Sequence, residues 1–204
     1  ELFEKGGPVM YLLLLCSLTV AAIAIDRFLL YRRASQGARA LEADVAAALR
    51  KKKLDEVAPA VKGKDNMVAH LIQSAVDARA AGEDVPMTLE AVYGEAAMLL
   101  RARLNYLSTI VTLAPLLGLL GTISGMIQSF SVFNLQAGQP MAITGGIGEA
   151  LIATATGLLV AIFALVVHTY FAQRMDTMLT LLEKTMNTLL AGFVAADGGR
   201  SHAS

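Results

Sequence analysis

Glu149 is the residue of this chain whose type and setting most suggest chemistry. It lies in the sequence Gly-Glu-Ala-Leu-Ile-Ala-Thr at the start of a long uncharged segment. An acidic side chain at the end of a membrane helix is costly when unpaired, so it is a functional candidate by default. The alternative is helix capping, because a carboxylate near a helix N-terminus gains roughly 0.3–1 kcal/mol from the helix dipole. The sequence leaves both interpretations open.

Two threonines lie deeper in uncharged segments. One face of the helix around Thr122 is polar or kinked along its length, because steps of seven residues from it give Ser108, Pro115 and Ser129. Thr154 begins a second row that reaches His168. A polar row in lipid is better explained by a helix interface or a wet pore, although an isolated hydroxyl more commonly bonds a carbonyl of its own helix.

Glycines accompany both threonines. Gly121 and Gly125 form a GxxxG pair, which in a bilayer commonly marks a helix-packing face because small residues let neighbouring backbones touch. We expect helix packing at Pro115, Gly118, Gly121, Gly125 and Gly157.

The elements that hold these residues are unusually apolar. Hydrophobic residues make up 55% of the 204 residues, against roughly 45–50% in soluble domains. Lys+Arg and Asp+Glu balance at 17 each, so net charge favours neither nucleic acid nor an acidic substrate as partner. The lone Cys16 has no second thiol for a disulfide or a metal site. We expect no metal and no cofactor.

Three segments are long enough to cross a membrane, which takes about 20 apolar residues. We place them at residues 8–30, 106–133 and 149–171, and the second contains no charged residue. The first could instead be a signal peptide, because Ala22-Ile23-Ala24 imitates a cleavage site. A signal peptide begins with basic residues, however, and this segment follows Glu1 and Glu4, so we expect a retained span.

The basic residues predict the orientation of these spans. Residues 134–148 contain no Lys or Arg, whereas residues 31–105 contain many. These are Arg32, Arg33, Arg39, Arg50, Lys51, Lys52, Lys53, Lys62, Lys64, Arg79, Arg101 and Arg103. Positive charge stays on the cytoplasmic side. We therefore expect residues 1–7 and 134–148 outside, and residues 31–105 and 172–204 in the cytoplasm.

The cytoplasmic parts have helical patterns. Leu41, Val45 and Leu49 repeat every four residues, and residues 68–76 carry a similar stripe. After a break at residues 82–86, Thr88 can cap a helix that continues into the second span, giving a helix over 88–133 of about 70 Å. Methionines and leucines from Met175 to Phe193 extend the third span in the same way, and we expect this stripe to be core packing.

The spans hold no acidic or basic residue near their centres. Proton relays through membranes normally use such groups. If protons pass through this protein, the mid-membrane titrating group must come from another chain or from ordered water.

Residues 114–126, followed by the segment Gly-Glu-Ala-Leu-Ile-Ala-Thr that ends at Thr154, resemble the paired signature of the ExbB/TolQ/MotA proton-channel family. Three spans make the chain more similar to ExbB and TolQ than to the four-span MotA type. Asp26-Arg27 resembles the acidic-Arg pair of that family, with Asp where Glu is usual. Phe163 departs from the family, since ExbB-type sequences often carry Pro there, which removes the expectation of a kink.

The resemblance implies an all-α protein of the bacterial inner membrane that forms a pentamer around a central pore. The pore would hold an ExbD-like single-span subunit with a membrane Asp, and the complex would use the proton motive force to drive a TonB-like envelope protein. Thr122 and Thr154 would face that Asp, and Glu149 would lie near the outer mouth. No covalent chemistry is implied, so the chain is not expected to be an enzyme.

Other functions fit the same sequence less well. A passive membrane scaffold would leave the polar rows unexplained. A TolQ-like role or a gliding-type stator would differ only in the partner driven, and Na⁺ could replace the proton. A transporter is disfavoured because the chain has no internal repeat of the kind that builds many carriers.

Overall fold

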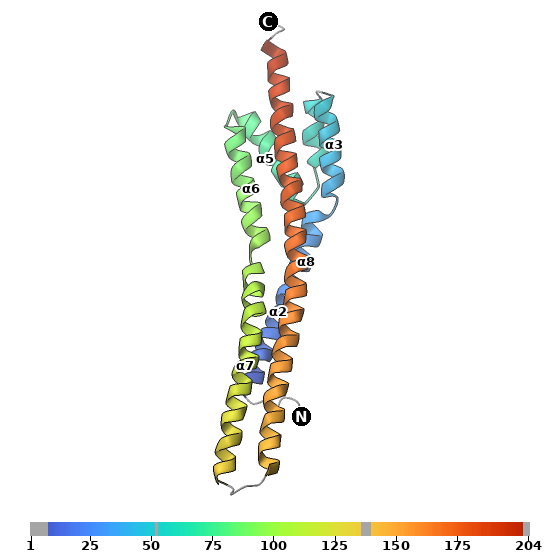
Figure 1. The fold of residues 1–204 in the computed structure, drawn as a ribbon. Helices are drawn as coiled ribbons and strands as arrows, with labels where there is room; N and C mark the ends of the chain where they lie inside the picture. Colours follow the sequence, from blue (N-terminus) through green and yellow to red (C-terminus); the bar gives the residue numbers. More distant parts are fainter. Residues whose placement is uncertain (1–7, 52, 136–139, 202–204) are drawn as a thin grey trace. The chain divides into compact units, whose positions relative to one another are not determined.

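The computed structural model describes residues 8–51, 53–135 and 140–201. Within these ranges all regular structure is helical (Figure 1). Three of the described helical stretches are long and apolar enough to cross a membrane. The all-α class and the three apolar helices predicted from the sequence are therefore confirmed.

The chain divides into two compact units. Unit 1 comprises Glu1–Asp26 and Arg103–Phe171, and unit 2 comprises Arg27–Ala102 and Ala172–Ser204. Two helices, α2 (Val9–Ser35) and α8 (Pro140–Ser201), contribute residues to both units.

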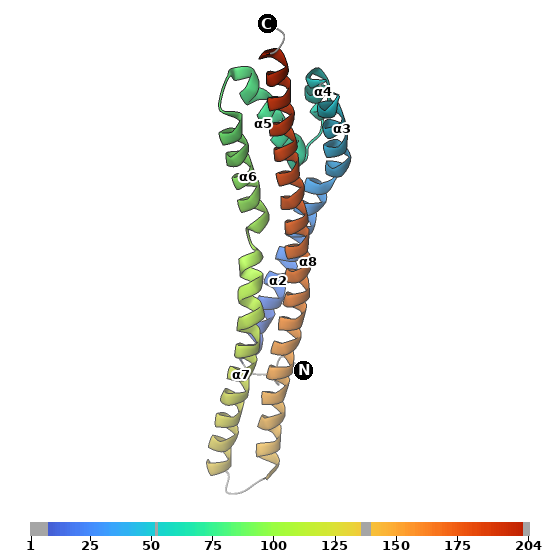
Figure 2. The same ribbon diagram turned by 45° about the horizontal axis from the view of Figure 1, so that its top comes forward.

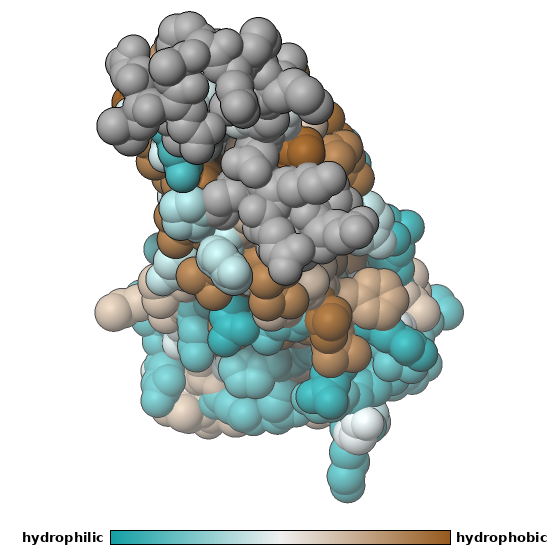
Figure 3. Space-filling model, turned by 90° about the horizontal axis from the view of Figure 1, so that it is seen from below, coloured by the Kyte–Doolittle hydropathy of each residue, from teal (hydrophilic) through white to brown (hydrophobic). Residues whose placement is uncertain are grey.

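Unit 1 consists of the first part of α2, the helix α7 (Leu104–Leu135) and the first part of α8. In this unit α7 and α8 run side by side (Figures 1 and 2). Many of its large hydrophobic side chains are exposed, and hydrophobic residues are visible on the face drawn in Figure 3. Examples are Leu15, Leu116, Ile127, Leu151, Leu159 and Val166. Such surfaces are suited to lipid or to other membrane helices.

Unit 2 packs short helices against the end of α2 and the C-terminal part of α8. They are α3 (Ala38–Arg50), the 3₁₀ turn η1 (Leu54–Glu56), α4 (Val57–Val61), α5 (Met67–Ala81) and α6 (Val85–Arg101). The predicted stripe of α3 is buried at Leu41, Val45 and Leu49. The stripe of α8 is also buried, at Met178, Leu182, Leu189 and Phe193. These apolar repeats are therefore core, as predicted.

The start of α6 differs from its predicted position. The N-cap is Asp84, whose side chain accepts a hydrogen bond from the Met87 N–H at 3.0 Å, and Thr88 lies inside the helix with its hydroxyl donating to the Asp84 carbonyl. The prediction of a Thr88 cap is wrong because Asp84 is a strong N-cap residue and Pro86 is tolerated in the first helical turn.

The helix predicted over 88–133 is also not continuous. α6 ends at Arg101 and α7 begins at Leu104. Between them Arg103 has φ 67°, a left-handed conformation that interrupts a right-handed helix. The prediction failed because none of residues 101–104 is Gly, Pro or Asn.

Distant contacts stabilise the two helix ends on either side of this break. In unit 2 the last carbonyls of α6 accept hydrogen bonds from α2, from Arg27 Nη1 to the Leu99 oxygen at 2.9 Å and from the Tyr31 hydroxyl to the Leu100 oxygen at 2.8 Å. Such terminal carbonyls have no partner within their own helix. In unit 1 Arg103 forms an ion pair with Asp26, at 2.9 Å.

α8 begins earlier than the predicted third span. It starts at Pro140, so the connecting segment predicted at residues 134–148 is helical from that residue on. From Pro140 the helix runs unbroken to Ser201. The prediction that the third span continues as a helix beyond residue 171 is confirmed.

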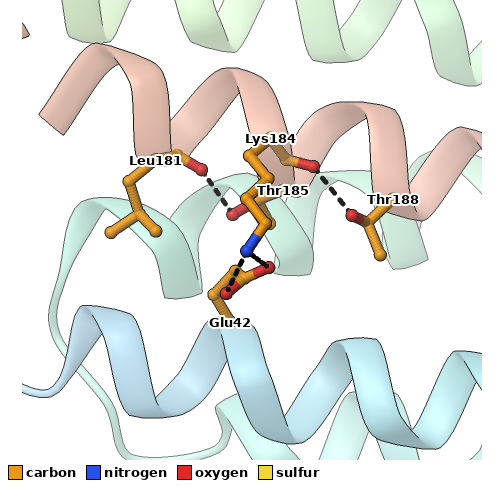
Figure 4. A network of polar contacts seen from close by, with 5 residues as sticks. All are labelled: Glu42, Leu181, Lys184, Thr185 and Thr188. Atoms are coloured by element: carbon orange, nitrogen blue, oxygen red, sulfur yellow. Dashed lines mark hydrogen bonds and ion pairs between the residues drawn. The ribbon is translucent and has the colours of Figure 1, made fainter. Parts of the chain in front are cut away.

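A buried carboxylate lies between α3 and α8 in unit 2 (Figure 4). Glu42 is only 7% exposed, and its two carboxylate oxygens lie 3.2 and 3.4 Å from Lys184 Nζ. The lysine side chain is 66% exposed. Lys184 therefore offsets the cost of burying the Glu42 carboxylate, while its own ammonium group stays exposed.

We expect Lys184→Met to lower the free energy of unfolding by about 1–3 kcal/mol, because it leaves the Glu42 carboxylate buried without its partner. Chemical denaturation of the detergent-solubilised chain, followed by circular dichroism, measures this. Lys53→Met is the control, since Lys53 and Glu56 form a surface pair with both side chains 55% exposed and should contribute at most about 1 kcal/mol. Equal losses in the two variants would contradict a special role for Glu42.

Candidate functional site: the contact between α7 and α8

The backbones of α7 and α8 approach most closely at Gly118 and Gly157. A Cβ atom on Gly157 would lie 2.6 Å from the Ala114 carbonyl oxygen and 3.0 Å from the Gly118 Cα. A Cβ atom on Gly118 would lie 3.1 Å from both the Ala153 carbonyl oxygen and the Thr154 Cα. These neighbours are backbone atoms, which cannot swing aside. Only glycine at position 157 fits this spacing.

The contact continues along both helices through small residues. A Cβ atom on Gly121 would lie 2.6 Å from the Ala153 Cβ, and one on Gly125 would lie 3.1 Å from the Ala150 Cβ. The same Cβ atom on Gly121 would lie 3.6 Å from the Cγ1 atom of Val9 on α2. The three apolar helices of unit 1 therefore meet at Gly121.

Sequence analysis missed the small residues on the α8 side of this contact. A Cβ atom on Gly146 would collide with Ser129, and both Ala150 and Ala153 are buried. Together with Gly157 they form a row of small residues three or four positions apart. That spacing is the signal that could have predicted them.

Thr154 joins the two helices by a hydrogen bond. Its hydroxyl donates to the Gly118 carbonyl oxygen on α7 at 3.0 Å. The bond does not go to a carbonyl of its own helix, in contrast to Thr156, whose hydroxyl donates to the Ile152 oxygen at 2.8 Å. The close approach at Gly118 is what brings the α7 backbone within reach of Thr154.

Thr122 is placed differently. It is partly exposed and donates to the Leu119 carbonyl oxygen of its own helix at 2.6 Å. It follows Gly118 by about one turn and so lies on the same side of α7. A hydroxyl has one donor and two acceptor lone pairs. Since the hydroxyls of Thr122 and Thr154 both donate to backbone oxygens, each has only acceptor capacity left for a further partner.

Pro115 lies inside α7 and is half-buried. It has no N–H, so the carbonyl of Val111 lacks the donor that a regular helix would supply. The residue that meets α8 at this level is its neighbour Ala114, through the contact of its carbonyl oxygen with Gly157.

Glu149 lies within α8, well beyond the first turn of a helix that begins at Pro140. The helix-capping interpretation of this residue therefore fails, because the dipole acts on charges in the terminal turn. The side chain of Glu149 is outside the described part of the structure.

Among the described residues no cluster of His, Cys, Asp and Glu could hold a metal ion. The arrangement thus consists of three apolar helices, a row of close glycine contacts and two hydroxyls with free acceptor positions.

A family model described as the MotA/TolQ/ExbB proton channel family matches residues 60–184. The chain belongs to this family. The match includes α7 and most of α8, and therefore the whole glycine contact between them.

Individual members of the MotA/TolQ/ExbB family agree with this assignment. ExbB-like 1 of Synechocystis sp. is 34% identical over 170 residues, which cover 81% of this chain and 67% of the relative. The Tol-Pal system protein TolQ of Pseudomonas aeruginosa is 33% identical over 108 residues, or 52% of this chain and 47% of TolQ. The biopolymer transport protein ExbB of Salmonella typhimurium is 39% identical over 74 residues, or 36% of this chain and 30% of ExbB.

Gly157→Ala should separate α7 from α8 and lower the free energy of unfolding by about 1–3 kcal/mol, the usual cost of overpacking. The melting temperature of the purified chain in detergent measures this. Gly148→Ala is the control on the same helix, because a Cβ atom there meets nothing within 4 Å. If both variants had the melting temperature of the native chain, the two backbones would not be in the close contact described.

Proposed function

We propose that this chain is the pore-forming stator subunit of a proton-driven motor in the bacterial inner membrane. Membership of a proton channel family supports this function, together with the hydroxyls of Thr154 and Thr122 beside the α7–α8 contact. The complex drives a TonB-like protein, which acts in import or in another envelope process. A TolQ-like role is the same mechanism with a different envelope partner.

The subunits assemble as a closed ring, which we propose to be a pentamer. The exposed hydrophobic residues of α7 and α8 need partners, and a closed ring buries them against lipid and neighbouring copies. The charge pattern supports an N-terminus outside and a C-terminus in the cytoplasm, with residues 31–105 and 172–204 on the cytoplasmic side.

The titrating group comes from a second subunit. Residues 106–133 contain no charged side chain, so we place in the pore an ExbD-like single-span helix that carries a membrane Asp. Proton relays through membranes depend on such acids. Thr122 and Thr154 face this Asp, and Glu149 acts in ion entry, gating or subunit contact.

The direction of the threonine hydrogen bonds determines what the pore wall does to that Asp. Both hydroxyls donate to backbone carbonyls, so they can accept a hydrogen bond from a protonated carboxyl but cannot donate one to a carboxylate without breaking a bond. A hydrogen bond to the neutral form disfavours the charged form. The wall therefore stabilises the proton-carrying state of the partner Asp, and release of the proton requires water or a hydroxyl rotation.

Thr154→Val should sharply reduce proton flux in vesicles that contain both subunits, because it removes the acceptor and the bond to Gly118. Thr154→Ser should retain flux, since the hydroxyl remains. Thr156→Val is the matched control for the bond between the two helices, because the Thr156 hydroxyl donates to the Ile152 oxygen of α8 and not to α7, and its loss should leave flux near normal. Normal flux in Thr154→Val would contradict the pore role, and no flux in the native complex would favour a passive scaffold.

Glu149→Gln should impair proton-driven work, whereas Glu149→Asp should keep part of it, because Asp retains the charge with a shorter reach. Growth that depends on the driven transport process measures both variants, with the amount of each protein in the membrane as the control. Full growth of the Gln variant would exclude a role for the charge.

A further inference from the structure

An open cleft of about 420 Å³ lies in unit 2 where α2 ends and α3 begins. It is lined by Arg33, Gln36, Gly37, Lys64, Asp65 and Asn66. We propose that this cleft binds the phosphate of an anionic phospholipid headgroup from the leaflet beside the end of α2. The proposal rests on the membrane position of α2 and on this cleft, and it is independent of the proposed motor function.

A buried asparagine builds the cleft. Asn66 is 9% exposed; its Nδ2 donates to the Gln36 carbonyl oxygen at 3.1 Å, and its Oδ1 accepts from the Ala69 N–H at 2.8 Å. One side chain therefore caps α5 and ties the turn before α5 to the end of α2, 30 residues earlier. Lys64 is held near Arg33 by this bond, not by proximity in sequence.

The cations of the cleft are available to a ligand. Arg33 and Lys64 are exposed, and within the described residues neither takes part in an ion pair. Arg guanidinium and Lys ammonium groups are the side chains that proteins use for phosphate. α3 also begins at the cleft with no side-chain cap and no acidic residue in its first turn, which leaves the local potential positive.

Further basic residues flank the two lining cations in the sequence. Arg32, Arg39 and Lys62 are close in sequence to the lining residues and are exposed. Asp65 is the one acidic side chain of the lining, and its charge opposes binding of a phosphate. The balance of the segment is strongly positive.

The position of the cleft relative to the end of the apolar segment favours a lipid headgroup over a soluble anion as its ligand. The first apolar segment ends near residue 30, and Arg33 to Gly37 follow about 5–10 Å further along the chain at about 1.5 Å per residue. The headgroup layer on each side of a bilayer is about 5–8 Å thick. Clusters of Lys and Arg directly beside a membrane helix bind anionic lipids. The positive-inside tendency alone explains basic residues in this segment, but not a cleft that collects two of them from distant positions.

A tryptophan reporter tests the proposal, because the chain has no native Trp. Phe28→Trp places the reporter one or two turns before the cleft, at an exposed position of α2. The full chain is reconstituted in phosphatidylcholine vesicles with increasing brominated phosphatidylglycerol, and quenching is compared with that by brominated phosphatidylcholine. We expect phosphatidylglycerol to be preferred several-fold next to this reporter.

Three variants in the reporter background test whether the cleft causes the preference for phosphatidylglycerol. Arg33→Gln with Lys64→Gln should remove most of the several-fold preference, because each basic residue beside the membrane surface contributes up to about fivefold. Arg50→Gln with Lys51→Gln removes the same charge at the other end of α3, about 20 Å away, and should leave it unchanged. Asp65→Asn should increase the preference. Unaltered circular dichroism melting curves would show that the surface substitutions leave the fold intact.

Several outcomes would overturn the proposal. An equal loss in the Arg50 and Lys51 control would reduce the preference to general electrostatics, and an unchanged preference without Arg33 and Lys64 would exclude the cleft. A decrease in Asp65→Asn would mean that the carboxylate takes part in recognition, against a cationic phosphate site. Inorganic phosphate in excess over the lipid should not compete; if it abolished the preference, the cleft would be a site for soluble phosphate.

Discussion

The close backbone contact between α7 and α8 is the constraint on which the candidate pore depends. A Cβ atom at Gly157 would lie 2.6 Å from a carbonyl oxygen of the facing helix, so the spacing exists only because that atom is absent. The same spacing brings the Gly118 carbonyl within 3.0 Å of the Thr154 hydroxyl. In a bilayer, where lipid tails are as apolar as the side chains, such packing and hydrogen bonding replace the hydrophobic effect as the attraction between helices.

The polarity of this contact has a chemical consequence. A hydroxyl that already donates to a backbone oxygen presents only lone pairs to a further partner, such as an acid in the proposed pore. A wall of this kind suits a neutral acid and does not suit an anion. It therefore complements a family whose described activity is proton conduction, since a proton crosses an apolar layer most cheaply while its carrier is uncharged.

In unit 2 the buried polar side chains also have specific partners. Glu42 has Lys184, and Asn66 has both the Gln36 carbonyl and the Ala69 amide. The last carbonyls of α6 accept hydrogen bonds from Arg27 and Tyr31. Among the described residues no buried side-chain nitrogen or oxygen lacks a hydrogen-bond partner. These paired groups give the short helices of unit 2 a specific arrangement that their apolar stripes alone would not define.

The sequence by itself determined the helical class, the three apolar helices and the buried stripes of α3 and α8, because these follow from composition and from periodicity within single helices. It also predicted which glycines allow close packing, but only the tertiary structure showed that they face Ala114, Ala150 and Ala153. Tertiary contacts decided the break at Arg103 and the partners of Asp26 and Arg27. They also decided the different hydrogen bonds of Thr154 and Thr156. A helix repeats every 3.6 residues whatever lies beside it, whereas the acceptor of a hydroxyl depends on which oxygen the fold brings within about 3 Å.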